Sequence, residues 1–141
     1  MKTGWYGTDE YYVVKTLENG YRQQLIVCVQ KEQGGRWNVF AGVFSSNSTY
    51  NSIKYSDVWK KPTSTNKNPS PKTIFLALEA LKQIEEELHN KANGKRWYIY
   101  VDGLDKRRLH AYTRILTKKC NYKISSVTSY YCGLPLIYKR V

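Results

Sequence analysis

The sequence predicts an α+β fold: a three-stranded antiparallel meander followed by helix, strand, helix and strand, arranged as one mixed sheet with two helices. The first observation behind this prediction is that runs rich in Val, Tyr, Ile and Phe open the chain at residues 11–17, 21–30 and 36–44. The second is that apolar residues recur at helical spacing in two later segments, and each of these segments is followed by a strand-like run.

Turn residues separate the opening strands and indicate that the strands fold back on one another. Asn19-Gly20 is a two-residue hairpin signal, because both residue types adopt positive φ at low cost. Gly34-Gly35 marks the next reversal. Residues 45–70 follow as a long polar loop rich in Ser, Thr and Asn, with a short strand at 52–59 as an alternative.

The first helix is predicted from its ends and from its apolar stripe. Ser70 supplies an N-cap and Pro71 occupies the first helical position, whereas Asn93-Gly94 closes the segment. Between these ends the apolar residues at helical spacing are Ile74, Leu78, Leu81, Ile84 and Leu88. We expect a helix of about 20 residues that buries one face.

The remaining elements alternate between strand and helix. Residues 96–101 form an aromatic strand, and residues 122–128 and 136–139 form the last two strands. Between them, a second helix is indicated by the stripe of Leu109, Tyr112, Leu116 and Cys120. This order places helical crossovers between parallel neighbours of the sheet.

Length and composition favour one domain over residues 1–141, and we expect it to be soluble and cytoplasmic. Its three cysteines form no C-x-x-C pair, which argues against a disulfide framework and a structural zinc site. His89 and His110 lack partners at ligand spacing, so we expect no metal, no cofactor and no catalytic residue. No segment has the length and apolarity of a membrane span, so we expect no membrane partner.

Positive charge is concentrated at the end of the chain. Residues 95–141 hold eleven Lys and Arg against two carboxylates, whereas residues 1–94 hold twelve against nine. Such a local imbalance indicates a basic surface, and its commonest partner is a polyanion. We therefore expect a nucleic acid, RNA or DNA, as the main partner. A protein partner remains open, as does the choice between monomer and homodimer.

The second helix carries much of this charge on one side. With Leu109 at the centre of the buried side, Arg107, Arg114 and Lys118 fall nearly opposite at 100° per residue. We expect the neighbouring cations to gather with them along one side of the sheet. The alternative is that these long side chains only keep an outer helix face solvated.

Exposed aromatic rings among such cations suit unstacked bases, because bases stack on rings while Lys and Arg contact phosphates. Candidate rings are Trp97, Tyr98, Tyr100, Tyr130 and Tyr131, although on alternating strands about half of the rings face the core. The predicted nucleic-acid-binding residues are Lys95, Arg96, Trp97, Lys106, Arg107, Arg108, Arg114, Lys118, Lys119, Lys123, Tyr131 and Arg140.

The order of elements resembles the ribonuclease H-like fold, and two fragments carry the likeness: residues 78–82 (LEALK) in the first helix, and the strand from Tyr98 to Asp102. In that family, carboxylates from the first strand, the first helix and the fourth strand converge on two magnesium ions. Only Asp102 matches one of them, because the meander strands contain no Asp and the helix position falls near Ser70. The resemblance therefore implies a non-catalytic relative.

Three functional hypotheses follow. The first is a small non-enzymatic nucleic-acid-binding protein that uses a basic C-terminal surface. The second is a protein-binding accessory or inhibitor protein of a phage or mobile element. The third is a metal-dependent nuclease centred on Asp102 and Asp105, although these two carboxylates are more simply helix caps.

Overall fold

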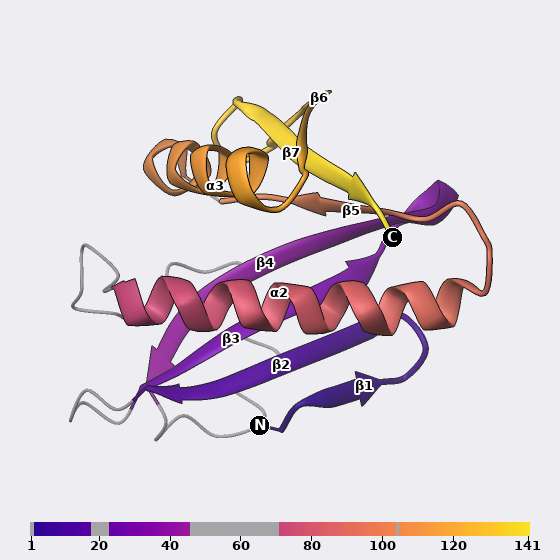
Figure 1. Ribbon diagram of the computed structural model, residues 1–141, viewed down its shortest axis with the longest axis horizontal. Helices are drawn as coiled ribbons and strands as arrows, with labels where there is room; N and C mark the ends of the chain where they lie inside the picture. The colour runs from indigo at the N-terminus through magenta and orange to yellow at the C-terminus, as the bar shows by residue number, and fades with distance from the viewer. Residues whose placement is uncertain (1, 18–22, 46–70, 104) are drawn as a thin grey trace. The chain divides into compact units, whose positions relative to one another are not determined.

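The computed structural model describes residues 2–17, 23–45, 71–103 and 105–141, and it confirms the α+β class. A mixed seven-stranded sheet has the order β1-β2-β3-β4-β5-β7-β6 and is accompanied by two helices (Figure 1). The strands are β1 (Gly4–Tyr6), β2 (Glu10–Leu17), β3 (Gln23–Lys31), β4 (Arg36–Ser45), β5 (Tyr98–Val101), β6 (Lys123–Thr128) and β7 (Pro135–Arg140). The helices are α2 (Pro71–Ala92) and α3 (Lys106–Lys119), and a short 3-10 turn, η1 (Gln33–Gly35), precedes β4.

The chain divides into two compact units. The first unit comprises Met1–Val29 and Ala41–Glu85, and the second comprises Gln30–Phe40 and Glu86–Val141. The boundary runs through β3, β4 and α2, so neither unit is a continuous piece of sequence. The expectation of one domain stays a prediction.

In the first unit, apolar strands pack with the first part of α2. The strand β3 is buried from Leu25 to Val29, which explains its almost continuous apolar sequence. The helix buries Ala80, Leu81 and Ile84 at the spacing of one helical face. A hydrogen bond of 3.0 Å from Gln83 Nε2 to the hydroxyl of Tyr11 on β2 ties the helix to the sheet.

The predicted reversal at Gly34-Gly35 is present, and both residues have positive φ. Gly35 is required there, because a Cβ atom would lie 2.9 Å from the carbonyl oxygen of Arg96 and 3.0 Å from Trp97 Cδ1. The predicted hairpin at Asn19-Gly20, the loop after β4 and the alternative strand at 52–59 lie outside the described residues.

The ends of α2 agree with the sequence signals. The helix begins at Pro71 and ends at Ala92, and Asn93 and Gly94 then adopt the left-handed conformation that commonly terminates helices. Ser70, the expected N-cap, lies outside the described residues. No helix in the described ranges is long and apolar enough to cross a membrane.

The sheet of the second unit is mixed, as predicted, but only one of its helices joins parallel neighbours. The helix α2 connects β4 to β5, and these two strands pair in parallel. By contrast, α3 connects β5 to β6, and β7 lies between them, antiparallel to both. The reason is that β6 and β7 form an antiparallel pair that folds back, so that β7 fills the position next to β5.

Candidate nucleic-acid interface

One face of the sheet in the second unit is core. Directly paired residues on neighbouring strands share a face of the sheet, so the strand register shows which residues belong to the core face. Five of its members are at most 5% exposed: Trp37, Val39, Ile99, Val101 and Ile137. The same register places two further residues on this face, the half-buried Lys139 of β7 and the 61% exposed Ile124 of β6. The ammonium group of Lys91, in the last turn of α2, lies 5.8 Å from the centre of the Trp37 ring, which places the end of α2 on this face. The helix α3 contacts β6 and β7 and contributes Leu109 and Leu116 to the core.

The opposite face of the same strands carries tyrosines and cations, and we call it the tyrosine face. The register arranges it in two rows. One row consists of Arg36 on β4, Tyr98 on β5 and Arg140 on β7. The other consists of Asn38 on β4, Tyr100 on β5, Tyr138 on β7 and Lys123 on β6. Arg140 and Lys123 are exposed, and the other five side chains are half-buried.

The rings of the tyrosine face contact one another. Tyr100 and Tyr138 are directly paired across β5 and β7 and stack with centres 5.5 Å apart and planes at 18°. Tyr98 lies diagonally from Tyr138, with ring centres 6.2 Å apart at 53°. The rings therefore form a continuous aromatic surface over two strands.

Arg36 is fixed within this surface. Its guanidinium carbon lies 4.5 Å from the centre of the Tyr100 ring, and its Nε donates a hydrogen bond of 2.9 Å to Asn38 Oδ1. The amide of Asn38 in turn donates to Glu32 Oε1 at 3.1 Å. These contacts hold the cation over the ring rather than leaving it free in solvent.

The tyrosine face ends after its second row. The next residues along these strands, Phe40, Asp102 and Leu136, are all buried. Ser129 Oγ lies 3.0 Å from both carboxylate oxygens of Asp102 and accepts a hydrogen bond of 3.1 Å from the amide of Tyr131. Asp102 therefore holds the turn between β6 and β7 against the end of β5.

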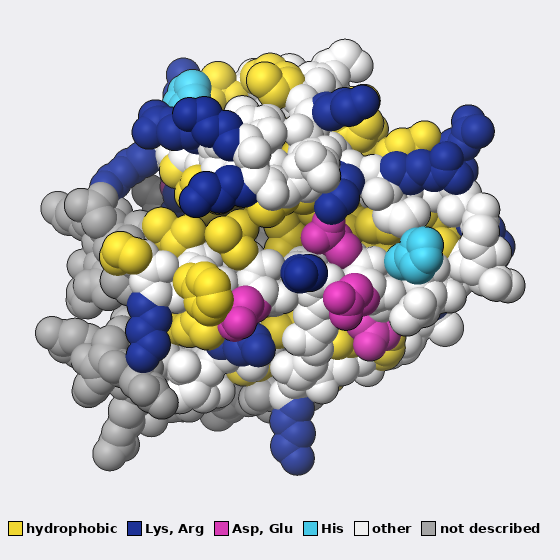
Figure 2. All heavy atoms as spheres, viewed as in Figure 1, with side chains coloured by type: hydrophobic (Ala, Val, Ile, Leu, Met, Phe, Trp, Pro, Cys, Tyr) yellow, Lys and Arg dark blue, Asp and Glu magenta, His cyan; other side chains and the backbone are white. Residues whose placement is uncertain are grey.

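The outer side of α3 forms a second cationic surface. Arg107, Arg114 and Lys118 are exposed there, opposite the buried Leu109 and Leu116, as the periodicity predicted. We call these three cations the basic ridge. None of them has a carboxylate partner within the described ranges. Dark blue side chains gather over α3 in Figure 2.

The start of α3 is capped and partly neutralised. The side chain of Asp105 accepts a hydrogen bond of 2.8 Å from the backbone amide of Arg108, which confirms Asp105 as the N-cap. The same carboxylate forms an ion pair with the guanidinium of Arg108 at 3.3 Å. Burial raises the pKa of the nearby Tyr112 phenol, while the positive charge of Arg108 lowers it and the negative charge of Asp105 raises it. Tyr112 thus stays protonated and neutral at neutral pH.

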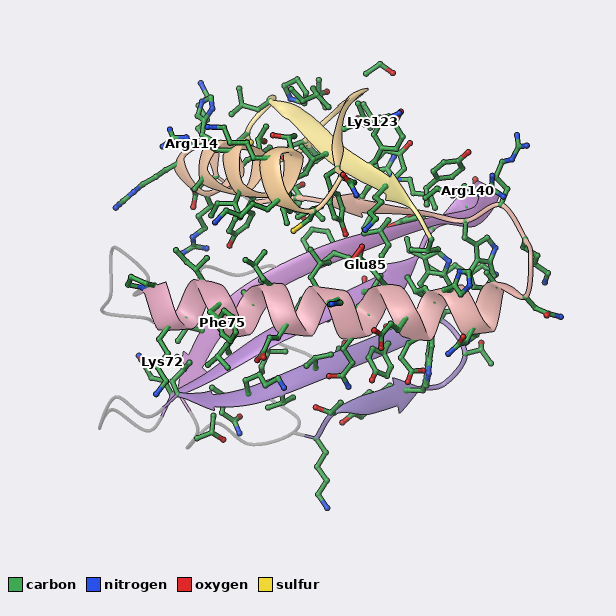
Figure 3. The ribbon with its side chains drawn as sticks, in the orientation of Figure 1. Lys72, Phe75, Glu85, Arg114, Lys123 and Arg140 are labelled. Carbon is green, nitrogen blue, oxygen red and sulfur yellow. The ribbon has the colours of Figure 1, made fainter. Side chains whose placement is uncertain are left out.

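The predicted cations do not all lie on one side of the sheet, which corrects the expectation that they gather together. The helix α3 covers the core face, so its ridge points away from the sheet on that side, whereas Lys123 and Arg140 belong to the tyrosine face. Figure 3 shows Arg114 on α3 well separated from Lys123 and Arg140 on the strands. The physical reason is that a helix packs with its apolar side on the sheet, so its polar side faces outward.

The individual candidates have different surroundings. Arg108 is half-buried and ion-paired, and the other predicted cations are exposed: Lys95, Arg96, Lys106, Arg107, Arg114, Lys118, Lys119, Lys123 and Arg140. Tyr131 is 51% exposed, and its neighbour Tyr130 is 95% exposed. The prediction that Trp97 offers an exposed ring is wrong, because Trp97 is only 7% exposed and its ring lies 5.1 Å from that of Trp37. It belongs to the core.

The predicted interface omitted Arg36, Asn38 and Tyr138. Alternation was the available signal, because in Tyr98-Ile99-Tyr100-Val101 the aromatic residues all fall on one side of a strand. The sequence does not show that β7 pairs with β5, and only this pairing adds Tyr138 and Arg140 to the same surface.

Carboxylates do not converge in the part of the chain that the structure describes. No group of three or more His, Cys, Asp or Glu side chains there is arranged to hold a metal ion. Asp105 caps α3, as expected, and Asp102 accepts hydrogen bonds from Ser129 of the β6–β7 turn.

Comparisons with protein families, with characterised proteins and with solved structures gave no match. The likeness to the ribonuclease H-like fold therefore stays a prediction.

Proposed function

We propose that this protein is a non-enzymatic nucleic-acid-binding protein that acts through the second unit. The supporting observation is its charge: the second unit contains fourteen Lys and Arg against five Asp and Glu, a net charge of +9, whereas the first unit has nine against six. Exposed cations contact phosphates without regard to sequence and release counterions, so binding falls steeply as salt rises.

The basic ridge suits this role because its cations are exposed and follow one line along α3. Residues 107, 114 and 118 lie on the outer side of a single rigid helix, so they present a fixed spacing to a phosphate backbone. The apolar side of the same helix packs on the sheet and keeps the ridge turned to solvent.

The test measures binding of labelled RNA, single-stranded DNA and duplex DNA at two salt concentrations. The variant Arg107→Ala, Arg114→Ala, Lys118→Ala is expected to weaken binding at least about tenfold at ~0.1 M salt. The plot of log affinity against log salt has a negative slope, and on duplex this slope is expected to become shallower by up to about 2.7. This is about 0.9 for each phosphate that the variant no longer neutralises.

A variant with equal charge change serves as the control. Lys2→Ala, Lys72→Ala, Lys82→Ala removes three exposed cations from the first unit, and we expect it to retain most of the affinity. Equal losses in both triple variants would show that net charge alone matters. Failure of the wild-type protein to bind any of the three nucleic acids at low salt would refute the proposed function.

One observation favours a second candidate function, the protein-binding accessory protein. Tyr130 and Tyr131 project from the β6–β7 turn with ring centres 5.5 Å apart in a T-shaped pair, and both are exposed. Exposed tyrosines are enriched in protein interfaces. If Tyr130→Ala, Tyr131→Ala abolished binding to a protein partner but left nucleic-acid affinity unchanged, this second function would gain support.

A further inference from the structure

We infer that the tyrosine face binds single-stranded nucleic acid, with unpaired bases stacked on Tyr98 and Tyr138 and the phosphates held by Arg140 and Lys123. This inference rests on the proposed function and names its ligand and its site. It assigns the selective surface to the strands rather than to α3.

The first argument is the geometry of the rings. Tyr98 and Tyr138 lie on neighbouring antiparallel strands, diagonal to each other, and their rings are half-buried rather than enclosed. Tyr100 lies between Arg36 and Tyr138, so it supports the surface more than it offers a free ring face. Two partly exposed rings on neighbouring strands provide a platform for two bases, as in other sheet surfaces that bind single strands.

The second argument is that each of these rings has a cation as its direct cross-strand partner. Arg140 is paired with Tyr98 across β5 and β7, and Lys123 is paired with Tyr138 across β6 and β7. A directly opposite residue lies about 5 Å away. A nucleotide whose base stacks on the ring would therefore place its phosphate within reach of the paired cation.

The third argument concerns selectivity. In a duplex the bases are stacked and paired inside the helix, so a broad sheet face cannot reach them with its rings. The tyrosine face therefore offers a duplex only its few cations. A single strand can turn its bases outward and use both rings and cations, so the face discriminates in favour of single strands.

The test compares binding of a labelled single strand of about 12 nucleotides, as RNA and as DNA, with binding of its duplex. We expect Tyr98→Ala, Tyr138→Ala to weaken single-strand binding at least about 30-fold, because neither ring remains for a base to stack on. We expect less than about a threefold change on duplex. Tyr98→Phe, Tyr138→Phe keeps the rings and should retain single-strand binding.

The matched control is Tyr130→Ala, Tyr131→Ala, which removes two exposed rings outside the tyrosine face and should leave single-strand affinity unchanged. Urea unfolding of each variant tests whether weaker binding comes from loss of the folded state; we expect each variant to be folded under the binding conditions. Suppose that the wild type binds nucleic acid. If the Tyr98→Ala, Tyr138→Ala variant then binds single strands as well as the wild type, or loses equal affinity for duplex and single strand, the inference is overturned and the proposed function stands. If the wild type binds no nucleic acid at low salt, both fail.

Discussion

The two faces of β5 differ in burial although their residues alternate along one strand of four residues. Ile99 and Val101 are buried in the core. Tyr98 and Tyr100 are half-buried and form part of an aromatic surface with cations on the neighbouring strands. Both faces are rich in apolar surface, so hydrophobicity alone does not distinguish them. The difference is one of burial: one face lies in the core, and the other keeps rings and cations partly exposed, which is the face that we propose for binding.

The largest expected difference between the two faces is in the free energy of unfolding that an alanine substitution costs. Ile99→Ala is expected to lower the free energy of unfolding by about 2–5 kcal/mol, because Ile99 is fully buried and leaves a cavity. Tyr98→Ala, one residue earlier, should cost about 1 kcal/mol, because it removes only cross-strand ring packing. Urea denaturation measures both. An equal cost would mean that the tyrosine face is a second core.

The next largest effect on the free energy of unfolding is expected at Asp102, where the tyrosine face ends. Asp102→Ala leaves the buried Ser129 hydroxyl without this acceptor, and we expect a decrease of about 1–3 kcal/mol in the free energy of unfolding. A double-mutant cycle with Ser129→Ala isolates the pair. The folded fraction should keep its affinity for single strands. Magnesium-dependent cleavage by the wild type that vanishes in Asp102→Ala would instead favour the nuclease hypothesis.

The smallest expected effect is on the salt dependence of binding, which should divide between the cations of the tyrosine face and those of the basic ridge. On single strands, Lys123→Ala, Arg140→Ala should make the negative slope of log affinity against log salt shallower by about 1.4. This is about 0.7 for each phosphate that these cations neutralise. On duplex the same variant should change the slope little, whereas the basic-ridge variant should make it shallower. Slopes that become shallower together on both ligands would contradict separate surfaces.

Local signals predicted the elements of the fold well. The limits of α2 follow from Pro71 and Asn93-Gly94, because proline is tolerated only at a helix start and glycine accepts the left-handed conformation at its end. The exposed side of α3 follows from the spacing of Arg107, Arg114 and Lys118. These features depend on residues that are close in sequence.

Features that depend on pairing between distant strands could not be predicted. The tyrosine face needs Tyr98 beside Arg140, which are more than forty residues apart in the sequence. Periodicity shows which residues share a side of a strand, but it does not show which strand lies next to it. The core position of Trp97 could not be predicted for the same reason, since it depends on contact with Trp37 of β4.

The edge of the sheet has a consequence for the behaviour of the protein in concentrated solution. Among the described residues, β6 is the last strand of the sheet, and its exposed Ile124 would favour pairing with a strand of another molecule. Its ladder to β7 shifts register between Ile124 and Thr128, and the strand begins with the charge of Lys123. An interrupted, positively charged edge is a poor template for intermolecular β-sheet, so we expect the register shift and Lys123 to protect this strand from aggregation.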